Sequence, residues 1–295
     1  MTKQTQLISI YLAVCKSYST TLVWEAQRLS NNFHPKFTDE EAITCYIFGI
    51  TERRLTMKDI YNFICDYWHG WFPDIPCYKQ FVTQINYLAP AIQTFAYMLL
   101  RTHFDAKTIE YLLDSLPIVV ASNKRSNRAK AANEICDKGY CASKGMYCYG
   151  VRLHGIVQSQ PHKLPIMHYF RVEPASSGDI TIAKDMLQTA ENMTIYADKA
   201  YIDACWQAEL AKRNVTILTP VKLKKDQSEL ERQFRYAADK LWSRAVSGIR
   251  QSIESFFSWL QDKTQIQYAS KIRSANGLIA FIFARIAAVA FEVNW

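Results

Sequence analysis

The segment 192-NMTIYADKAYID-203 decides how the centre of the chain is interpreted. Thr194, Ile195 and Tyr196 are typical strand residues, so they predict the end of a buried strand, and Asp198 follows where that strand stops. A helical pattern begins at once, at about residue 201. A carboxylate at the end of a core strand is poorly hydrated and costs stability unless something compensates it. Asp198 is therefore expected to be either a helix N-cap or a ligand.

Strand and helix patterns alternate on both sides of this segment from about residue 108 onward. Three strand candidates precede it, and the second alternates between an apolar and a polar face. A helix, the strand ending at Asp198, a second helix, a further strand and long helices follow. This order predicts a mixed α/β sheet with helices packed on its faces. The strand candidates cover residues 108–122, 146–157, 164–175 and 215–221, and the helices cover about 179–191 and 201–213.

Residues 1–105 have a different pattern and are predicted to be helical. Thr38 and Glu41 have the spacing of a capping box, and Thr56 precedes a second one-faced helix. Successive short helices fit either a helix-turn-helix DNA reader or a plain helical bundle. The predicted domains are therefore a helical N-terminal region over 1–105 and an α/β domain with C-terminal helices over 106–295.

Positive charge is concentrated in two blocks. The net charge of the 295 residues is +8, and residues 1–100 contribute none of it, with eight basic and eight acidic groups. Residues 121–154 carry seven basic and two acidic groups, and residues 219–273 carry eleven and six. Basic blocks on either side of a mildly acidic middle suit a polyanionic partner, although a solvated basic surface has the same composition.

Cysteine usage and hydrophobicity indicate a cytosolic protein without a membrane span. The eight cysteines are scattered and no signal peptide is apparent before them, so reduced thiols are expected. The most apolar run, 277–291, contains Arg285 and is shorter than the roughly 20 residues that a membrane-spanning helix needs. We therefore predict a buried C-terminal helix there.

Three acidic residues are notable for their positions, and each also has an ordinary structural explanation. Asp114 lies within the first strand candidate and could stabilise a turn before Pro117. Asp198 could cap the helix that follows it. Glu254 lies at the border of the buried face of a predicted helix, where Arg250 could form an ordinary i,i+4 salt bridge with it. Brought together by the sheet, however, these three carboxylates would repel one another unless cations bound them.

Such a carboxylate cluster favours hard divalent cations. Mg²⁺ or Mn²⁺ prefers carboxylate oxygens, whereas zinc would prefer the cysteine and histidine groups. Two ions about 3.5 to 4 Å apart would hold the attacking and leaving oxygens of a phosphodiester in line. The cluster therefore predicts phosphodiester chemistry that uses two Mg²⁺ or Mn²⁺ ions.

The ordered motifs LLDSLP, YGVRLH, EPASSGD, YADKAY, ILTPVKLK and RQSIESFFSWL resemble the catalytic domain of bacterial insertion-sequence transposases of the DDE class. The resemblance spans about residues 108–262 and implies a ribonuclease-H-like fold. It implies that Asp114, Asp198 and Glu254 are the catalytic, metal-binding triad and that Arg250 is the basic residue preceding the glutamate. Ala200 replaces the usual glycine and Arg152 the usual lysine, and neither change removes a metal ligand.

Seven basic residues are candidate DNA contacts. One group lies in the polar connection after the first strand, and the others flank the acidic residues: Lys124, Arg125, Arg128, Arg152, His154, Lys199 and Arg250. Solvated or packed side chains are the alternative at each of these positions.

The resemblance implies a DNA transposase, expected in the bacterial cytoplasm and at the nucleoid when it acts. It would cleave the terminal inverted repeats, transfer the freed strand into target DNA and form a homodimer on DNA. The helical region over 1–105 would then serve end recognition or dimerisation. Two alternatives stay open at this point. One is a ribonuclease-H-like nuclease without strand transfer, and the other is a catalytically inactive DNA-binding or assembly protein.

Overall fold

The computed structural model describes residues 2–27, 35–105, 107–141, 145–160, 163–222 and 229–292, with only the backbone described over 229–235. The chain divides into two compact units. The helical unit comprises residues 1–102, 128–135 and 260–294, and the sheet unit comprises residues 103–127 and 136–259. The predicted domain boundary between residues 105 and 106 stays a prediction.

The helical unit is built on the central helix α3 (Asp39–Thr51) and on α11 (Ala275–Glu292). The capping box predicted at α3 is confirmed, because Thr38 N donates to Glu41 Oε2 at 2.7 Å and Glu41 N donates to Thr38 Oγ1 at 3.2 Å. Helix α11 packs against α3, α5 and α6 and is buried over most of its length, as predicted. The other helices are α1 (Lys3–Ser17), the π-helix η1 (Tyr18–Leu22), α2 (Val23–Glu25), α4 (Met57–Tyr67), α5 (Tyr78–Tyr87) and α6 (Ala89–Arg101).

Two helical stretches are long and apolar enough to cross a membrane by length and composition alone. They are Lys3–Glu25 and Ala275–Glu292, and 72% of the second is buried inside the protein. The buried core helix of a globular fold passes the same test of length and composition. These two helices are therefore only weak evidence for a membrane span.

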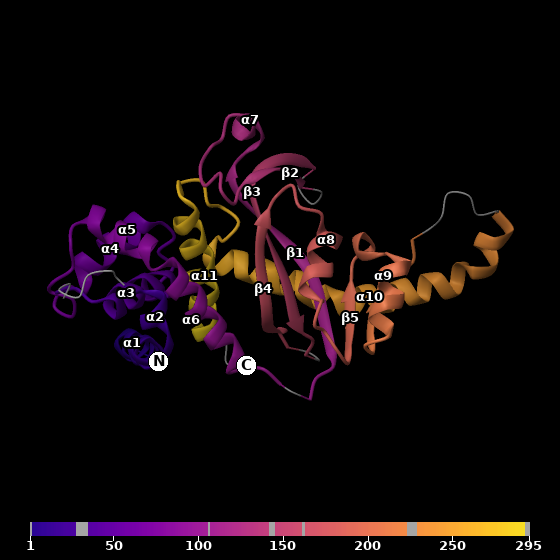
Figure 1. The fold of residues 1–295 in the computed structure, drawn as a ribbon, viewed down its shortest axis with the longest axis horizontal. Helices are drawn as coiled ribbons and strands as arrows, with labels where there is room; N and C mark the ends of the chain where they lie inside the picture. Colours follow the sequence, from indigo (N-terminus) through magenta and orange to yellow (C-terminus); the bar gives the residue numbers. More distant parts are fainter. Residues whose placement is uncertain are drawn as a thin grey trace. The chain divides into compact units, whose positions relative to one another are not determined.

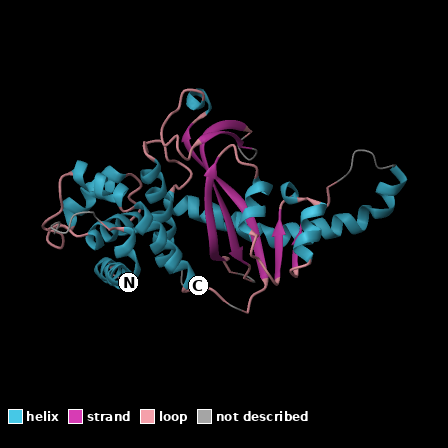
Figure 2. Cartoon of the chain, in the orientation of Figure 1, coloured by secondary structure: helices cyan, strands magenta, loops and turns pink. Residues whose placement is uncertain are grey.

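The sheet unit contains one six-stranded mixed sheet, which confirms the predicted α/β class (Figure 2). The strand order is β2-β3-β1-β5-β6, and β4 also pairs with β3. The pairs β1–β3, β2–β3 and β3–β4 are antiparallel, and β1–β5 and β5–β6 are parallel. The strands are β1 (Glu110–Ala121), β2 (Asp137–Cys141), β3 (Met146–Gln158), β4 (Ile166–Pro174), β5 (Met193–Ala197) and β6 (Val215–Leu218).

The connection between β1 and β3 is more structured than its sequence suggested. It was expected to be a polar loop, but it contains the short helix α7 (Asn123–Ser126) and the edge strand β2. Charged residues and a glycine hide the strand pattern of Asp137–Cys141. The pairing partner, β3, supplies the order that the local sequence does not specify.

Helices cover both faces of the sheet (Figure 1). Helices α8 (Asp179–Met186) and α9 (Ala204–Ala211) and the 3₁₀ turn η3 (Lys199–Tyr201) lie on one face and form a buried core with β1, β5 and β6. The long helix α10 (Glu229–Thr264) runs behind the other face. The two faces of β1 and β5 therefore meet different helices, and this difference positions the candidate site.

Candidate active site

The two candidate aspartates lie at equivalent positions on neighbouring parallel strands. Leu113 of β1 pairs with Ala197 of β5. Asp114 directly follows Leu113, and Asp198 directly follows Ala197. Leu113 and Ala197 belong to the core beneath α8 and α9. Because successive side chains of a strand point to opposite faces, Asp114 and Asp198 face the α10 side together.

Helix α10 carries the third carboxylate to this face of the sheet. Ile253 and Phe256 are fully buried, and Glu254 lies beside them with a side chain that is 43% exposed. Arg250, one turn earlier, donates to Asp114 Oδ2 at 3.2 Å and to Glu254 Oε1. A single guanidinium therefore joins a carboxylate from β1 to one from α10.

Gly155 allows α10 to approach the sheet this closely. It pairs with Asp114 on one side and with Phe170 of β4 on the other. A Cβ atom at this position would lie 2.6 Å from Phe170 Cε1 and 3.3 Å from Phe257 Cζ, the latter on α10. Phe257 is three residues beyond Glu254 on α10. Because Gly155 has no side chain, Phe257 can pack close to the sheet, and this packing helps to set the distance between Glu254 and Asp114.

The charge balance at Asp114 indicates a site suited to a cation. Burial raises the pKa of this carboxyl to about 6, against the lowering effects of the Ser115 N–H, 2.8 Å from Asp114 Oδ1, and of Arg250. The negative charges of Glu254 and Asp198 raise the pKa further. A second positive charge would therefore be stabilised here.

Asp198 also has the capping role that its sequence position allowed. Its Oδ1 accepts a hydrogen bond from Lys199 N at 2.7 Å, at the start of η3. This bond uses one of the two carboxylate oxygens. Capping and ligation are therefore compatible at Asp198.

The three carboxylates have the chemistry of ligands for a divalent cation, and Arg250 pairs with two of them, Asp114 and Glu254. They offer oxygen donors alone, which is the ligand type that Mg²⁺ and Mn²⁺ prefer. Within the described part of the chain, no group of three His, Cys, Asp or Glu side chains is arranged to hold a metal ion. The Arg250 guanidinium binds both Asp114 and Glu254, so a cationic group is already present between them.

A family model described as "Transposase DDE domain" matches residues 104–274, which is more than half of the chain. The chain belongs to this transposase family. The match contains all six strands together with Asp114, Asp198 and Glu254, and the mixed sheet with flanking helices agrees with a ribonuclease-H-like transposase fold. Comparisons with curated proteins and with solved structures give no match. DNA is therefore the partner of the transposase.

Asp179 is a residue of the transposase that the sequence interpretation did not assign. It begins α8 and accepts hydrogen bonds from Ser115 Oγ at 3.0 Å and from Arg152 Nη1 at 2.8 Å. The other Arg152 amino group donates to the Tyr140 carbonyl at 2.7 Å. The sequence did offer one indication of Asp179, because this residue ends the EPASSGD motif of the resemblance. Asp179 thus holds Arg152 on the α8 face, and the role of Arg152 as a DNA contact stays a prediction.

His154 is buried next to the same carboxylate. Its Nδ1 lies 3.8 Å from Asp179 Oδ1, and its side chain is only 1% exposed. Burial lowers its pKa to about 4, although the negative charge of Asp179 acts in the opposite direction. His154 is therefore neutral at pH 7. A direct DNA contact from His154 stays a prediction that this burial does not favour.

The other predicted DNA contacts are accessible in the transposase. Lys124 and Arg125 are exposed on α7 in the sheet unit, and Arg128 is exposed in the helical unit. Lys199 is exposed and follows Asp198 directly. Of these four, Lys199 is the one next to a candidate ligand, whereas Arg250 is only 17% exposed as a side chain.

Proposed function

We propose that this transposase cleaves the ends of an insertion sequence and joins the freed 3′ end to target DNA. The observation that supports the proposal is the arrangement of Asp114, Asp198 and Glu254. Asp114 lies on β1, Asp198 directly follows β5 and Glu254 lies on α10, and the negative charges of Asp198 and Glu254 raise the pKa of Asp114. We assign these three residues as metal ligands and catalytic residues. Arg250 and Lys199 are assigned as phosphate contacts beside them.

Each of these residues has a defined role in the proposed reaction. Two Mg²⁺ or Mn²⁺ ions, when bound, would supply charge neutralisation and an activated water for in-line displacement at phosphorus. Asp114 holds its oxygens on β1, Asp198 holds its oxygens at the end of the neighbouring parallel strand β5, and Glu254 closes the site from α10. Arg250, once released from the carboxylates, is placed to contact a phosphate oxygen by charge-assisted hydrogen bonds.

The proposed partners follow from the reaction. Two transposon ends must be brought together, so we propose a homodimer on DNA that binds terminal inverted repeats and target DNA. The proposed location is the bacterial cytoplasm, at the nucleoid during transposition, with no membrane partner.

The proposal is tested with DNA that carries the coding region and its own flanking sequences. Cleavage at the flanks that requires Mg²⁺ or Mn²⁺, followed by joining of a pre-cut 3′ end to a second DNA, is the expected result. Cleavage without joining would support a nuclease instead. Binding without either reaction would support an inactive DNA-binding protein.

Arg250→Gln is expected to raise the affinity of the DNA-free protein for Mn²⁺ by about tenfold or more. The substitution removes a guanidinium whose hydrogen bond to the part-buried Asp114 contributes roughly 1.5 to 3 kcal/mol, and the i,i+4 pair with the half-exposed Glu254 adds only about 0.3 to 0.5 kcal/mol. About 1.4 kcal/mol corresponds to a factor of ten. Calorimetric titration with Mn²⁺ measures the change. Arg244→Gln, at an exposed position of the same helix, is the control. Equal affinities for both variants would contradict competition between Arg250 and the metal.

A further inference from the structure

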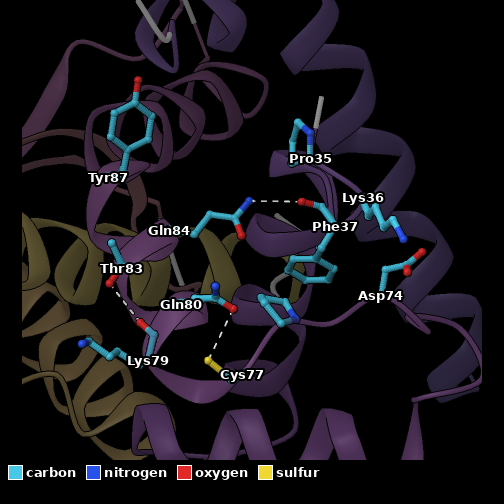
Figure 3. Close-up of a pocket in the computed structure, with 11 residues that line it drawn as sticks. Pro35, Lys36, Phe37, Asp74, Cys77, Lys79, Gln80, Thr83, Gln84 and Tyr87 are labelled. Atoms are coloured by element: carbon cyan, nitrogen blue, oxygen red, sulfur yellow. Dashed lines mark hydrogen bonds between the residues drawn. The ribbon is translucent and has the colours of Figure 1, made fainter. Parts of the chain in front are cut away.

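Among the described residues of the helical unit lie a larger and a smaller hollow that the proposed reaction does not use. The larger, of about 730 Å³, is lined by polar and apolar side chains together with Lys36, Lys79 and Asp74, and it carries charges of both signs (Figure 3). The smaller, of about 360 Å³, is lined by residues of α3, α4, α5, α11 and the segment 265–274. All of its lining residues belong to the helical unit. We call it the basic pocket.

The charges of the basic pocket are all of one sign. Lys58, Lys271, Arg273 and Arg285 line it, and no aspartate or glutamate does. In the described part of the chain no carboxylate forms an ion pair with any of the four. Positive charges that lack a carboxylate partner leave the pocket with a potential that attracts an anion.

The floor and the mouth of the basic pocket differ in their properties. Arg285 is buried in the floor and is held by the Thr264 carbonyl at 2.9 Å and the Leu55 carbonyl at 2.7 Å. At the mouth, Lys58 and Lys271 are exposed, and so is the ring of Tyr268, at 60%. The floor is therefore fixed, whereas the charged and aromatic groups at the mouth are accessible to a ligand.

We propose that the basic pocket binds one unpaired nucleotide of a DNA strand. Cations that track the phosphate together with aromatic rings on which a base stacks are the combination by which proteins hold single strands. The volume lies at the lower end of the range of small-ligand pockets, so it suits one nucleotide and excludes a duplex. Membership of a family that acts on DNA selects a DNA strand among anionic aromatic ligands.

Charge reversal at the mouth tests the phosphate contact. Binding of a labelled single-stranded oligonucleotide to the full chain is measured by fluorescence anisotropy in EDTA, so that the result does not depend on cleavage. The double variant Lys58→Glu and Lys271→Glu is expected to bind about tenfold more weakly or worse. The control, Lys16→Glu with Arg101→Glu, makes the same charge change at exposed positions of the same unit. An equal loss in the control would reduce the effect to net charge and overturn the site.

Substitution of Tyr268 tests base stacking. Tyr268→Ala is expected to weaken oligonucleotide binding by about fivefold or more, whereas Tyr268→Phe keeps the ring and the affinity. Tyr67→Ala removes an exposed aromatic side chain of α4, outside the pocket, and is the matched control. Circular dichroism checks that each variant is folded. Unchanged binding by Tyr268→Ala would overturn the stacking contact.

Competitors identify the source of the nucleotide. A blunt duplex and free thymidine monophosphate are both expected to compete less well than the single strand. Competition by the duplex as strong as that by the single strand would overturn the assignment to an unpaired nucleotide. Competition by the free nucleotide as strong as that by the strand would show a free-nucleotide site instead and would also overturn the proposal.

Discussion

Asp198→Asn is expected to slow DNA cleavage by the transposase by more than about a hundredfold while DNA binding in EDTA is retained. Charge stabilisation by a bound metal ion contributes several kcal/mol to such reactions, and each 1.4 kcal/mol changes the rate tenfold. Asn keeps the shape of the side chain and an oxygen that can accept the Lys199 N–H bond. The loss is therefore expected in the reaction rather than in folding. Single-turnover cleavage of flanking DNA with Mg²⁺ measures it.

A control five residues later separates catalysis from capping. Asp203 is the N-cap of α9, where its Oδ1 accepts from Trp206 N at 3.0 Å and its Oδ2 accepts from Lys184 Nζ at 2.7 Å. Asp203→Asn is expected to keep the rate of cleavage. If Asp198→Asn cleaves as fast as Asp203→Asn, Asp198 is a cap and nothing more.

The sequence could indicate that Asp114 and Asp198 lie close together, whereas their role as metal ligands stays a prediction. Asp114 and Asp198 each lie next to a run of apolar strand residues, and parallel pairing of β1 with β5 brings such positions together. What the sequence did not show is how Arg250 divides its hydrogen bonds. Its spacing from Glu254 indicated an i,i+4 pair, but the bond to Asp114 spans 136 positions in the chain. No local pattern contains that contact.

Strand β3 shows where periodicity failed. Its alternation predicted one apolar and one polar face, yet the strand is buried on both, because β1, β2 and β4 all pair with it and helices cover it. Arg152 and His154 on the expected polar face lie against Asp179, a residue of α8. A distant carboxylate thus makes the burial of Arg152 tolerable, and a single-sequence pattern cannot reveal such a partner.

The C-terminal helix shows a related limit. Its composition predicted burial, and the structure agrees. The sequence did not indicate that α11 packs against α3 and α6, helices that lie far away in the chain. Hydrophobicity shows that a face must be covered, but the identity of the covering element depends on the whole fold.

Gly155→Ala is expected to lower the free energy of unfolding by about 1 to 3 kcal/mol and the rate of cleavage by about a hundredfold. The added methyl group would lie 2.6 Å from Phe170 and 3.3 Å from Phe257, so the rings must move. Phe257 carries α10 with it, and a displacement of about 1 Å between Glu254 and Asp114 is enough to slow catalysis by this factor. Denaturant unfolding and single-turnover cleavage, at a temperature where the variant is folded, measure the two effects.

Gly248→Ala is the matched control for this substitution. Gly248 lies on the same helix two residues before Arg250, and a Cβ atom there meets nothing within 4 Å. Alanine should therefore stabilise α10 by up to about 1 kcal/mol and leave cleavage unchanged. If Gly155→Ala loses stability but cleaves at the rate of the parent, the distance of α10 from the sheet does not control the site. In that case the Glu254 side chain would be flexible enough to reach the site from a displaced helix.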